Sequence, residues 1–221
     1  MNKRLLRSYY PPPIAVPTGE GSEMVHYLHR RLARRLYLPF AAVFLLVNSL
    51  AQAQDDYVWA PDFPVGSTLP VISAEDQNGN LRTIDDLVGE NGMLFMLSRS
   101  FDWRPYCKAQ LVQLIEISDQ FEAMGLSVVA MTYDSVELLK EVEADEGIEF
   151  ALLHDEGITH VNALGILNED YEPGSRAYGV PHPGIFLVDS EGVIQFKFAE
   201  ARYQDRPDFD FVIEAAETMQ D

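Results

Sequence analysis

The only cysteine of the chain, Cys107, follows an apolar stretch and lies two residues after a proline that can begin a helix. Pro105 suits the first helical position, because the N–H that it lacks would have no helical partner there. Cys107 would then fall in the first turn, where unpaired backbone N–H groups and the helix dipole favour a thiolate. The positive charges of Arg104 and Lys108 act in the same direction, and the negative charge of Asp102 opposes them.

A single thiol limits the redox chemistry that this chain can perform. It can be oxidised to a sulfenic acid, but the chain has no second cysteine with which to close an internal disulfide. Its recovery would therefore need an external thiol reductant. Cys107 is a candidate nucleophile with Arg104 as its electrostatic partner. The alternative interpretations are a thiol that is buried in the core and inert, and a thiol that pairs with another molecule.

Other side chains in two segments are candidates for binding a substrate beside the thiol. Trp103 and Tyr106 would form a partly exposed aromatic ledge, although plain packing explains them equally well. His182 lies in a proline-rich loop expected over residues 168–183 and could titrate near the thiol, although a surface histidine is the simpler interpretation.

Two further groups of polar residues are expected to be structural. The histidine and acidic side chains within residues 154–160 are explained by the end of a strand and the start of a helix, so we predict no metal site and no cofactor. Arg202 and Arg206 are expected to form ion pairs with acidic neighbours rather than to bind substrate.

The net charge of −19 is unevenly distributed along the chain. Residues 1–53 contain seven basic and two acidic side chains, whereas residues 54–221 contain nine basic and 33 acidic ones, a net charge of −24. Such a negative domain repels phosphate backbones, which argues against nucleic acid and anionic membranes as its partners.

The first 53 residues are predicted to be an N-terminal extension with a secretory signal peptide. From Met24, a possible true start, a basic segment ends at Arg35 and is followed by a 15-residue apolar run and the small residues 51–53. This order is typical of a signal cleaved after Ala53, which predicts a periplasmic or secreted protein. Because a bilayer span needs about 20 residues, membrane contact is expected only through the signal segment.

The remaining residues, 54–221, predict one α/β domain. Strands are expected over 93–97, 126–131, 150–153, 184–189 and 193–198, and a hairpin turn at Asn78-Gly79. Helices are expected from Pro105 to a stop at Gly125, and over 135–146, 158–164 and 208–219. Alternating strands and helices that end in a strand hairpin predict a three-layer α/β/α sandwich with a central mixed sheet.

Three segments resemble redoxins of the alkyl hydroperoxide reductase/thiol-specific antioxidant (AhpC/TSA, peroxiredoxin-like) superfamily. Residues 101–111, Phe-Asp-Trp-Arg-Pro-Tyr-Cys-Lys-Ala-Gln-Leu, look like the active-site turn Ala-Asp-Trp-Cys-Pro-Tyr-Cys-Lys-x-Gln-Leu. Residues 178–189 are similar to the Pro-x-x-Phe-Leu-Ile-Asp signature, and residues 77–87 to the hairpin that precedes the first core strand. The resemblance covers roughly residues 60–220 and implies a thioredoxin fold.

The same resemblance implies roles for several residues, and the chain also departs from the family pattern. Cys107 occupies the position of the peroxidatic cysteine, but Arg104 replaces the first cysteine of the thioredoxin pair and the threonine of peroxiredoxins. Ser100 stands where peroxiredoxins have a proline, and Pro183 where they have an arginine. Pro183 also matches the cis-proline of thioredoxins, which implies a cis bond beside Cys107 and a backbone platform for substrate.

Two functions follow from these observations. The first is an exported thiol-dependent oxidoreductase that uses Cys107 alone, with Trp103, Tyr106, His182 and Pro183 around its substrate. It would reduce peroxides or exchange with external thiols and disulfides. The second is a catalytically silent thioredoxin-fold module that binds a polypeptide partner or scaffolds an assembly. Exposure of Cys107 would favour the first function, and its burial the second.

Overall fold

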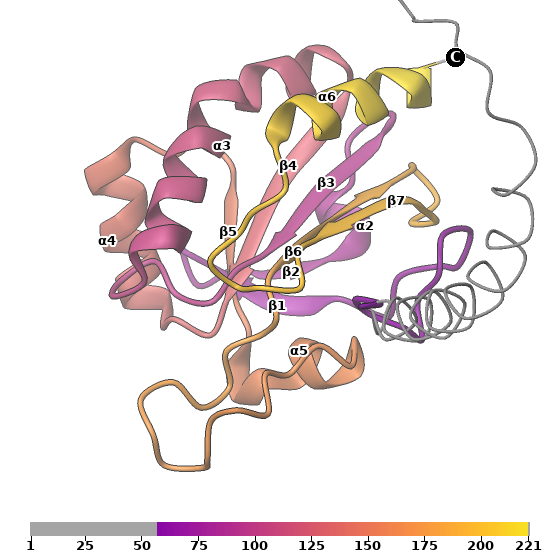
Figure 1. Ribbon diagram of the computed structural model, residues 1–221. Helices are drawn as coiled ribbons and strands as arrows, with labels where there is room; N and C mark the ends of the chain where they lie inside the picture. Colours follow the sequence, from indigo (N-terminus) through magenta and orange to yellow (C-terminus); the bar gives the residue numbers. More distant parts are fainter. Residues whose placement is uncertain (1–56, 221) are drawn as a thin grey trace, which may run out of the picture. The chain divides into compact units, whose positions relative to one another are not determined.

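The computed structural model describes residues 57–220 (Figure 1). The predicted extension and signal segment, residues 1–53, lie outside the described residues. The described strands form one seven-stranded sheet in the order β2-β1-β5-β4-β3-β6-β7. Their bounds are β1 Ser73–Asp76, β2 Leu81–Thr83, β3 Gly92–Leu97, β4 Leu126–Thr132, β5 Ala151–His154, β6 Gly184–Val188 and β7 Ile194–Ala199. The sheet is mixed, since β3, β4 and β5 are parallel and the remaining pairs are antiparallel.

Helices cover the sheet on both faces, as Figure 1 shows. The helical segments are α2 Ile84–Leu87, α3 Pro105–Ala123, α4 Val136–Glu146, η1 Glu156–Ile158, α5 Thr159–Ala163, α6 Phe209–Glu217 and η2 Thr218–Gln220. The long helices α3, α4 and α6 pack on one face, and the short α2 and α5 pack on the other. The three-layer sandwich and its mixed sheet are therefore confirmed. None of the helices within residues 57–220 is long and apolar enough to cross a bilayer.

The central strand β3 explains why the core has two halves. All six of its residues are buried. Because successive side chains of a strand point to opposite faces, Leu94 and Met96 join the core under α3, whereas Met93, Phe95 and Leu97 join the other core. A continuous apolar run is what a strand covered on both faces requires.

Local signals in the sequence mark most element ends correctly. Asn78 and Gly79 form the turn between β1 and β2, with Gly79 at φ 75°. Helix α3 ends before Gly125 at φ 74°, where a residue without a Cβ avoids steric strain. Ser135 begins α4, and its hydroxyl accepts a hydrogen bond from the N–H of Leu138 at 3.4 Å.

The irregular lead-in, residues 57–72, contributes more to the core than its composition predicts. Trp59 is buried, and its ring packs on Phe186 with 4.5 Å between ring centroids. Gly184 is required below it, because a Cβ there would come within 2.6 Å of the indole. The ammonium group of Lys197 donates to three lead-in carbonyls at 2.6–3.0 Å. The lead-in therefore covers β6 on the face of the sheet that carries only the short helices α2 and α5.

Candidate active site

The candidate site forms where β3 and β4 end and α3 begins. The turn of residues 98–104 leaves β3, and Pro105 is the first residue of α3. The N–H of Cys107 donates to the carbonyl of Arg104 at 3.0 Å, which places the cysteine in the first helical turn as predicted. Its side chain is only 1% exposed and packs in the core between α3 and the sheet. A reagent can reach this sulfur only if a covering segment moves.

An arginine from a distant loop contacts the sulfur. Arg206 lies in the connection between β7 and α6, and its Nη2 donates to Sγ of Cys107 at 3.4 Å. The expectation that Arg206 forms an ion pair with an acidic neighbour is wrong for the described residues. Its neighbour Arg202 does form one, with Asp205 at 3.6 Å. The difference arises because the guanidinium of Arg206 reaches Cys107 at the start of α3, whereas Arg202 is exposed.

A buried carboxylate holds the turn that precedes Cys107. Asp134 follows β4, and its carboxylate accepts hydrogen bonds from the hydroxyl of Ser100 at 2.8 Å and the N–H of Phe101 at 2.6 Å. The hydroxyl of Thr132 donates to the same carboxylate at 3.0 Å. Burial raises the pKa of Asp134, although these hydrogen bonds act in the opposite direction. Asp134 was not identified from the sequence, because Ser100 and Phe101 lie in the turn after β3 and are more than 30 positions away in the sequence.

Trp103 and Arg104 form a stack at the edge of the site. The guanidinium carbon of Arg104 lies 3.9 Å from the ring centroid of Trp103, and that of Arg176 lies 4.9 Å from it. The indole N–H of Trp103 donates to the hydroxyl of Tyr133 at 3.1 Å. Trp103 is half-buried and Tyr106 is 49% exposed, which agrees with the expected aromatic ledge. The guanidinium of Arg104 thus contacts aromatic rings, and the guanidinium at the sulfur belongs to Arg206.

A second missed residue, Arg99, is fully buried directly after β3. Its Nη2 donates to the hydroxyl of Tyr171 at 2.8 Å, and its guanidinium carbon lies 4.1 Å from the ring centroid of Tyr203. Tyr171 comes from the loop before β6 and Tyr203 from the loop after β7. The sequence signal that could have identified this site is an arginine at the end of an apolar strand. Burying a charged side chain costs free energy unless the charge is paired or hydrogen-bonded.

The backbone that carries His182 and Pro183 does not have the conformation predicted for it. Within residues 57–220 no peptide bond is cis, so the predicted cis bond before Pro183 is wrong. The segment runs extended from a bridge with Leu167 directly into β6, without the tight turn that would justify the less stable isomer.

The backbone of His182 is also unavailable as a platform for substrate. Its N–H donates to the carbonyl of Ile166 at 2.7 Å, and its carbonyl accepts from the indole of Trp59 at 2.8 Å. Burial lowers the pKa of the His182 ring, with a further lowering by the charge of Arg99 and an opposing effect of Asp170. The predicted backbone platform at His182 is therefore occupied, and substrate binding by the side chains of His182 and Pro183 stays a prediction.

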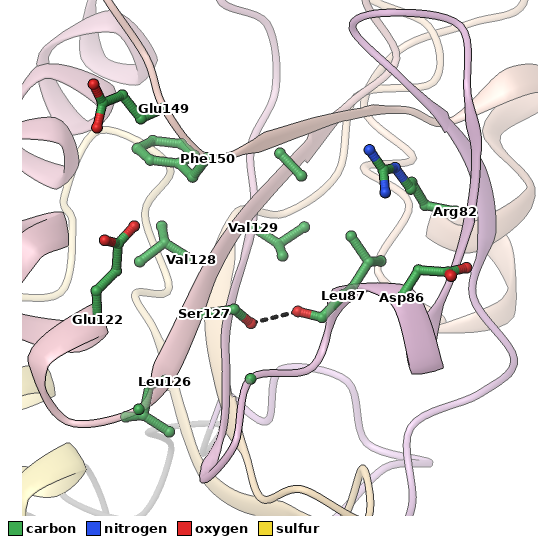
Figure 2. A pocket seen from close by; sticks show the side chains of 13 residues that line it. Arg82, Asp86, Leu87, Glu122, Leu126, Ser127, Val128, Val129, Glu149 and Phe150 are labelled. Atoms are coloured by element: carbon green, nitrogen blue, oxygen red, sulfur yellow. Dashed lines mark hydrogen bonds between the residues drawn. The ribbon is translucent and has the colours of Figure 1, made fainter.

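A separate pocket of about 430 Å³ lies at the other end of α3 (Figure 2). Its walls include Arg82, Glu122, Glu149 and Phe150, and a hydroxyl of Ser127 donates to a backbone carbonyl at its floor. Since α3 rises about 1.5 Å per residue, this end is roughly 24 Å from the thiol. Within the described part of the chain no group of three or more histidine, cysteine and acidic side chains is placed to hold a metal ion.

Comparison with known proteins tests the resemblance found in the sequence. A family model described as the AhpC/TSA family matches residues 65–197, more than half of the chain. The chain belongs to the AhpC/TSA family. This AhpC/TSA protein is 25% identical over 143 residues to peroxiredoxin Bcp of Escherichia coli K12. The alignment covers 65% of this chain and 90% of the relative. It is 23% identical over 145 residues to the 1-Cys peroxiredoxin PER1 of Hordeum vulgare. That alignment covers 62% of this chain and 65% of the relative.

Solved structures confirm the thioredoxin fold of this AhpC/TSA protein. The thiol peroxidase from Chromobacterium violaceum superposes with a TM-score of 0.62 at 22% identity, covering 71% of this chain and 88% of that one. The family match ends at residue 197. Tyr203 and Arg206 lie beyond it, so the loop that covers the cysteine is outside the family's matched segment.

Proposed function

We propose that this AhpC/TSA protein is a thiol peroxidase that uses Cys107 as its only redox-active group. Membership of the family supports a thiol peroxidase in general. The observation that carries the single-cysteine proposal is the hydrogen bond from Arg206 to Sγ, since it places a positively charged donor against the proposed nucleophile. Arg206 would supply the positive charge that the family takes from the arginine replaced here by Pro183.

The proposed reaction proceeds in balanced steps. The thiolate of Cys107 attacks the terminal oxygen of a hydroperoxide, so that an S–O bond forms while the O–O bond breaks. The alkoxide leaves, takes up a proton and becomes the alcohol, and the sulfur becomes a sulfenic acid. One external thiol then displaces water to form a mixed disulfide. A second thiol releases Cys107 and carries away the disulfide, which restores the enzyme.

Access to the thiol requires movement of the loop between β7 and α6. Arg206 separates two surface grooves of about 450 and 310 Å³, which lie on either side of this loop. The loop has no regular secondary structure from residue 200 to residue 208, so it can open without breaking the sheet. We propose that a peroxide enters when this loop lifts Arg206 from the sulfur.

Trapping of the sulfenic acid tests the proposal. The full chain, reduced and then treated with one equivalent of tert-butyl hydroperoxide in the presence of dimedone, is expected to gain one dimedone adduct at Cys107. The Cys107→Ser variant serves as the matched control and is expected to gain none. A folded parent protein whose thiol takes up no dimedone under excess peroxide would contradict the proposal.

The burial of Cys107 favours the second candidate function, a catalytically silent module. A thiol that is only 1% exposed does not react with solutes unless the segment that covers it moves away. In that case the partly exposed stack of Trp103, Arg104 and Arg176 would be the surface that contacts a polypeptide partner. The dimedone experiment separates the two, because only the peroxidase is oxidised in the folded state.

We also propose that the protein is exported through the signal predicted in residues 1–53. Expression of the full chain in a bacterium with a periplasm is expected to give a processed protein that begins at or near Gln54. Amino-terminal sequencing of the periplasmic fraction checks this. Full-length protein retained in the membrane would instead identify residues 36–50 as an anchor.

A further inference from the structure

Three arginines in the segments before and beside the start of α3 have buried donors without partners among the described residues. Within residues 57–220, six buried side-chain nitrogen or oxygen atoms have no hydrogen-bond partner, and four of them belong to arginines. These are Nε and Nη1 of Arg99, Nε of Arg104 and Nε of Arg206. A guanidinium only donates hydrogen bonds, so each of these atoms requires an acceptor. A buried donor that is left unpaired is costly, so these guanidinium groups favour an additional acceptor.

The arginines share a frame of aromatic rings, here called the arginine cage and made of Arg99, Arg104, Trp103, Tyr171 and Tyr203. The guanidinium carbon of Arg99 lies 5.3 and 4.1 Å from the ring centroids of Tyr171 and Tyr203. That of Arg104 lies 5.5 and 5.8 Å from the same two rings. Two positive charges therefore face the same pair of tyrosines, although like charges repel.

The surrounding acidic side chains do not neutralise this charge. Residues 57–220 contain 30 acidic and nine basic side chains. Nevertheless Arg99, Arg104 and Arg206 form no ion pair with any carboxylate in that part of the chain. Burial raises the pKa of Tyr171, but hydrogen bonds and charge from Arg99 and Arg104 outweigh it and hold the pKa below its ordinary value. The cage is a place that favours negative charge.

We propose that the arginine cage binds the carboxylate of an organic substrate, so that the peroxide reduced at Cys107 is a carboxylate-bearing organic hydroperoxide. This proposal rests on the proposed peroxidase function. The planar guanidinium fork matches a carboxylate with two parallel hydrogen bonds, and the rings of Trp103, Tyr171 and Tyr203 offer apolar walls for the organic part. Tyr203 and Arg206 belong to one loop, and Arg206 donates to the carbonyl of Tyr203. The loop thus links the cage to the sulfur.

The substrate would enter the cage from the side of Arg104. Arg104 is partly exposed, whereas Arg99 is covered by Tyr171 and Tyr203. Both tyrosines lie in irregular connections, which can move without loss of strand or helix hydrogen bonds. The loop movement that uncovers Cys107 would displace Tyr203 as well, so one opening would serve both the carboxylate and the peroxide.

Calorimetric titration tests the cage without any redox step. Sodium hexanoate is expected to bind the full-length Cys107→Ser variant with saturation, whereas the neutral 1-hexanol is not. Arg104→Gln is expected to weaken hexanoate binding at least about 10-fold, since a bidentate charged contact is lost. Arg99→Met is expected to do the same if it folds. Arg202→Gln, which removes an exposed arginine of the same loop, is the matched control and is expected to leave binding unchanged.

The outcomes separate the cage from the peroxidase. Hexanoate binding that depends on Arg104, without any peroxide oxidation of Cys107, would support the cage and contradict the peroxidase. Peroxide oxidation of Cys107 with no hexanoate binding, or with equal binding by Arg104→Gln, would overturn the cage alone. Sulfate that competes as strongly as hexanoate would also overturn the assignment to an organic carboxylate.

Discussion

Replacing Arg206 by methionine is expected to slow the oxidation of Cys107 by hydroperoxide about 100-fold, the loss typical of removing one charge-stabilising donor from a reaction centre. The reason is the 3.4 Å hydrogen bond from Nη2 to Sγ, which places a positive charge and a donor against the reacting sulfur. Methionine keeps an apolar side chain of similar length over the sulfur, so the change removes charge with little loss of packing. Stopped-flow measurement of the second-order rate constant with tert-butyl hydroperoxide gives the effect.

Two companion variants define what this result means. Arg206→Lys keeps the positive charge but loses the planar fork, and it is expected to retain an intermediate rate. Arg202→Met removes an exposed arginine four residues earlier, whose ion pair with Asp205 contributes little, and it is expected to react like the parent. A rate that is unchanged in Arg206→Met would show that Arg206 only covers the thiol.

Replacing Asp134 by alanine is expected to lower the free energy of unfolding by about 3 kcal/mol, within the range for breaking a buried hydrogen-bond network. The change leaves the N–H of Phe101 and the hydroxyl of Ser100 without their acceptor, and both belong to the turn that precedes Cys107. Denaturant unfolding of the two proteins at several pH values measures the difference. Asp119→Ala, an exposed aspartate on α3, is the control and is expected to change stability by less than about 0.5 kcal/mol.

The pH dependence gives this prediction a definite sign. The pKa of Asp134 is raised in the folded protein, because burial disfavours the charged carboxylate. A raised carboxyl pKa stabilises the fold most below the pKa of the unfolded chain and loses that contribution as pH rises through the folded value. The stability difference between the parent and Asp134→Ala should therefore be largest in acid. A difference that grows from acid toward neutral pH would contradict a raised pKa.

Much of the fold was predictable because the relevant signals are local. The apolar run of β3, the turn at Gly79 and the stop at Gly125 each report a constraint within one element. The same holds for Cys107, whose place in the first turn of α3 follows from Pro105. The resemblance to redoxins predicted the fold of the whole domain, and the family match confirmed the resemblance over residues 65–197.

The order of the strands and the surroundings of the sulfur were decided by the tertiary structure. Arg206 reaches Cys107 across 99 positions of sequence, and its short-range pattern, an arginine among acidic residues, predicted an ion pair instead. The bond before Pro183 is trans, and the backbone of His182 is paired with Ile166 and with the side chain of Trp59.

By itself the sequence determined that this protein has one thiol, at the start of a helix, in a redoxin fold. The thiol and its place in a helix follow from residue types and local periodicity, and the redoxin fold follows from the resemblance of three segments to that family. Only the tertiary structure decided that Cys107 is buried, that Arg206 contacts it and that Arg99 and Arg104 share one aromatic frame. Irregular loops bring these groups together, and the packing of loops has no period in the sequence from which it can be inferred.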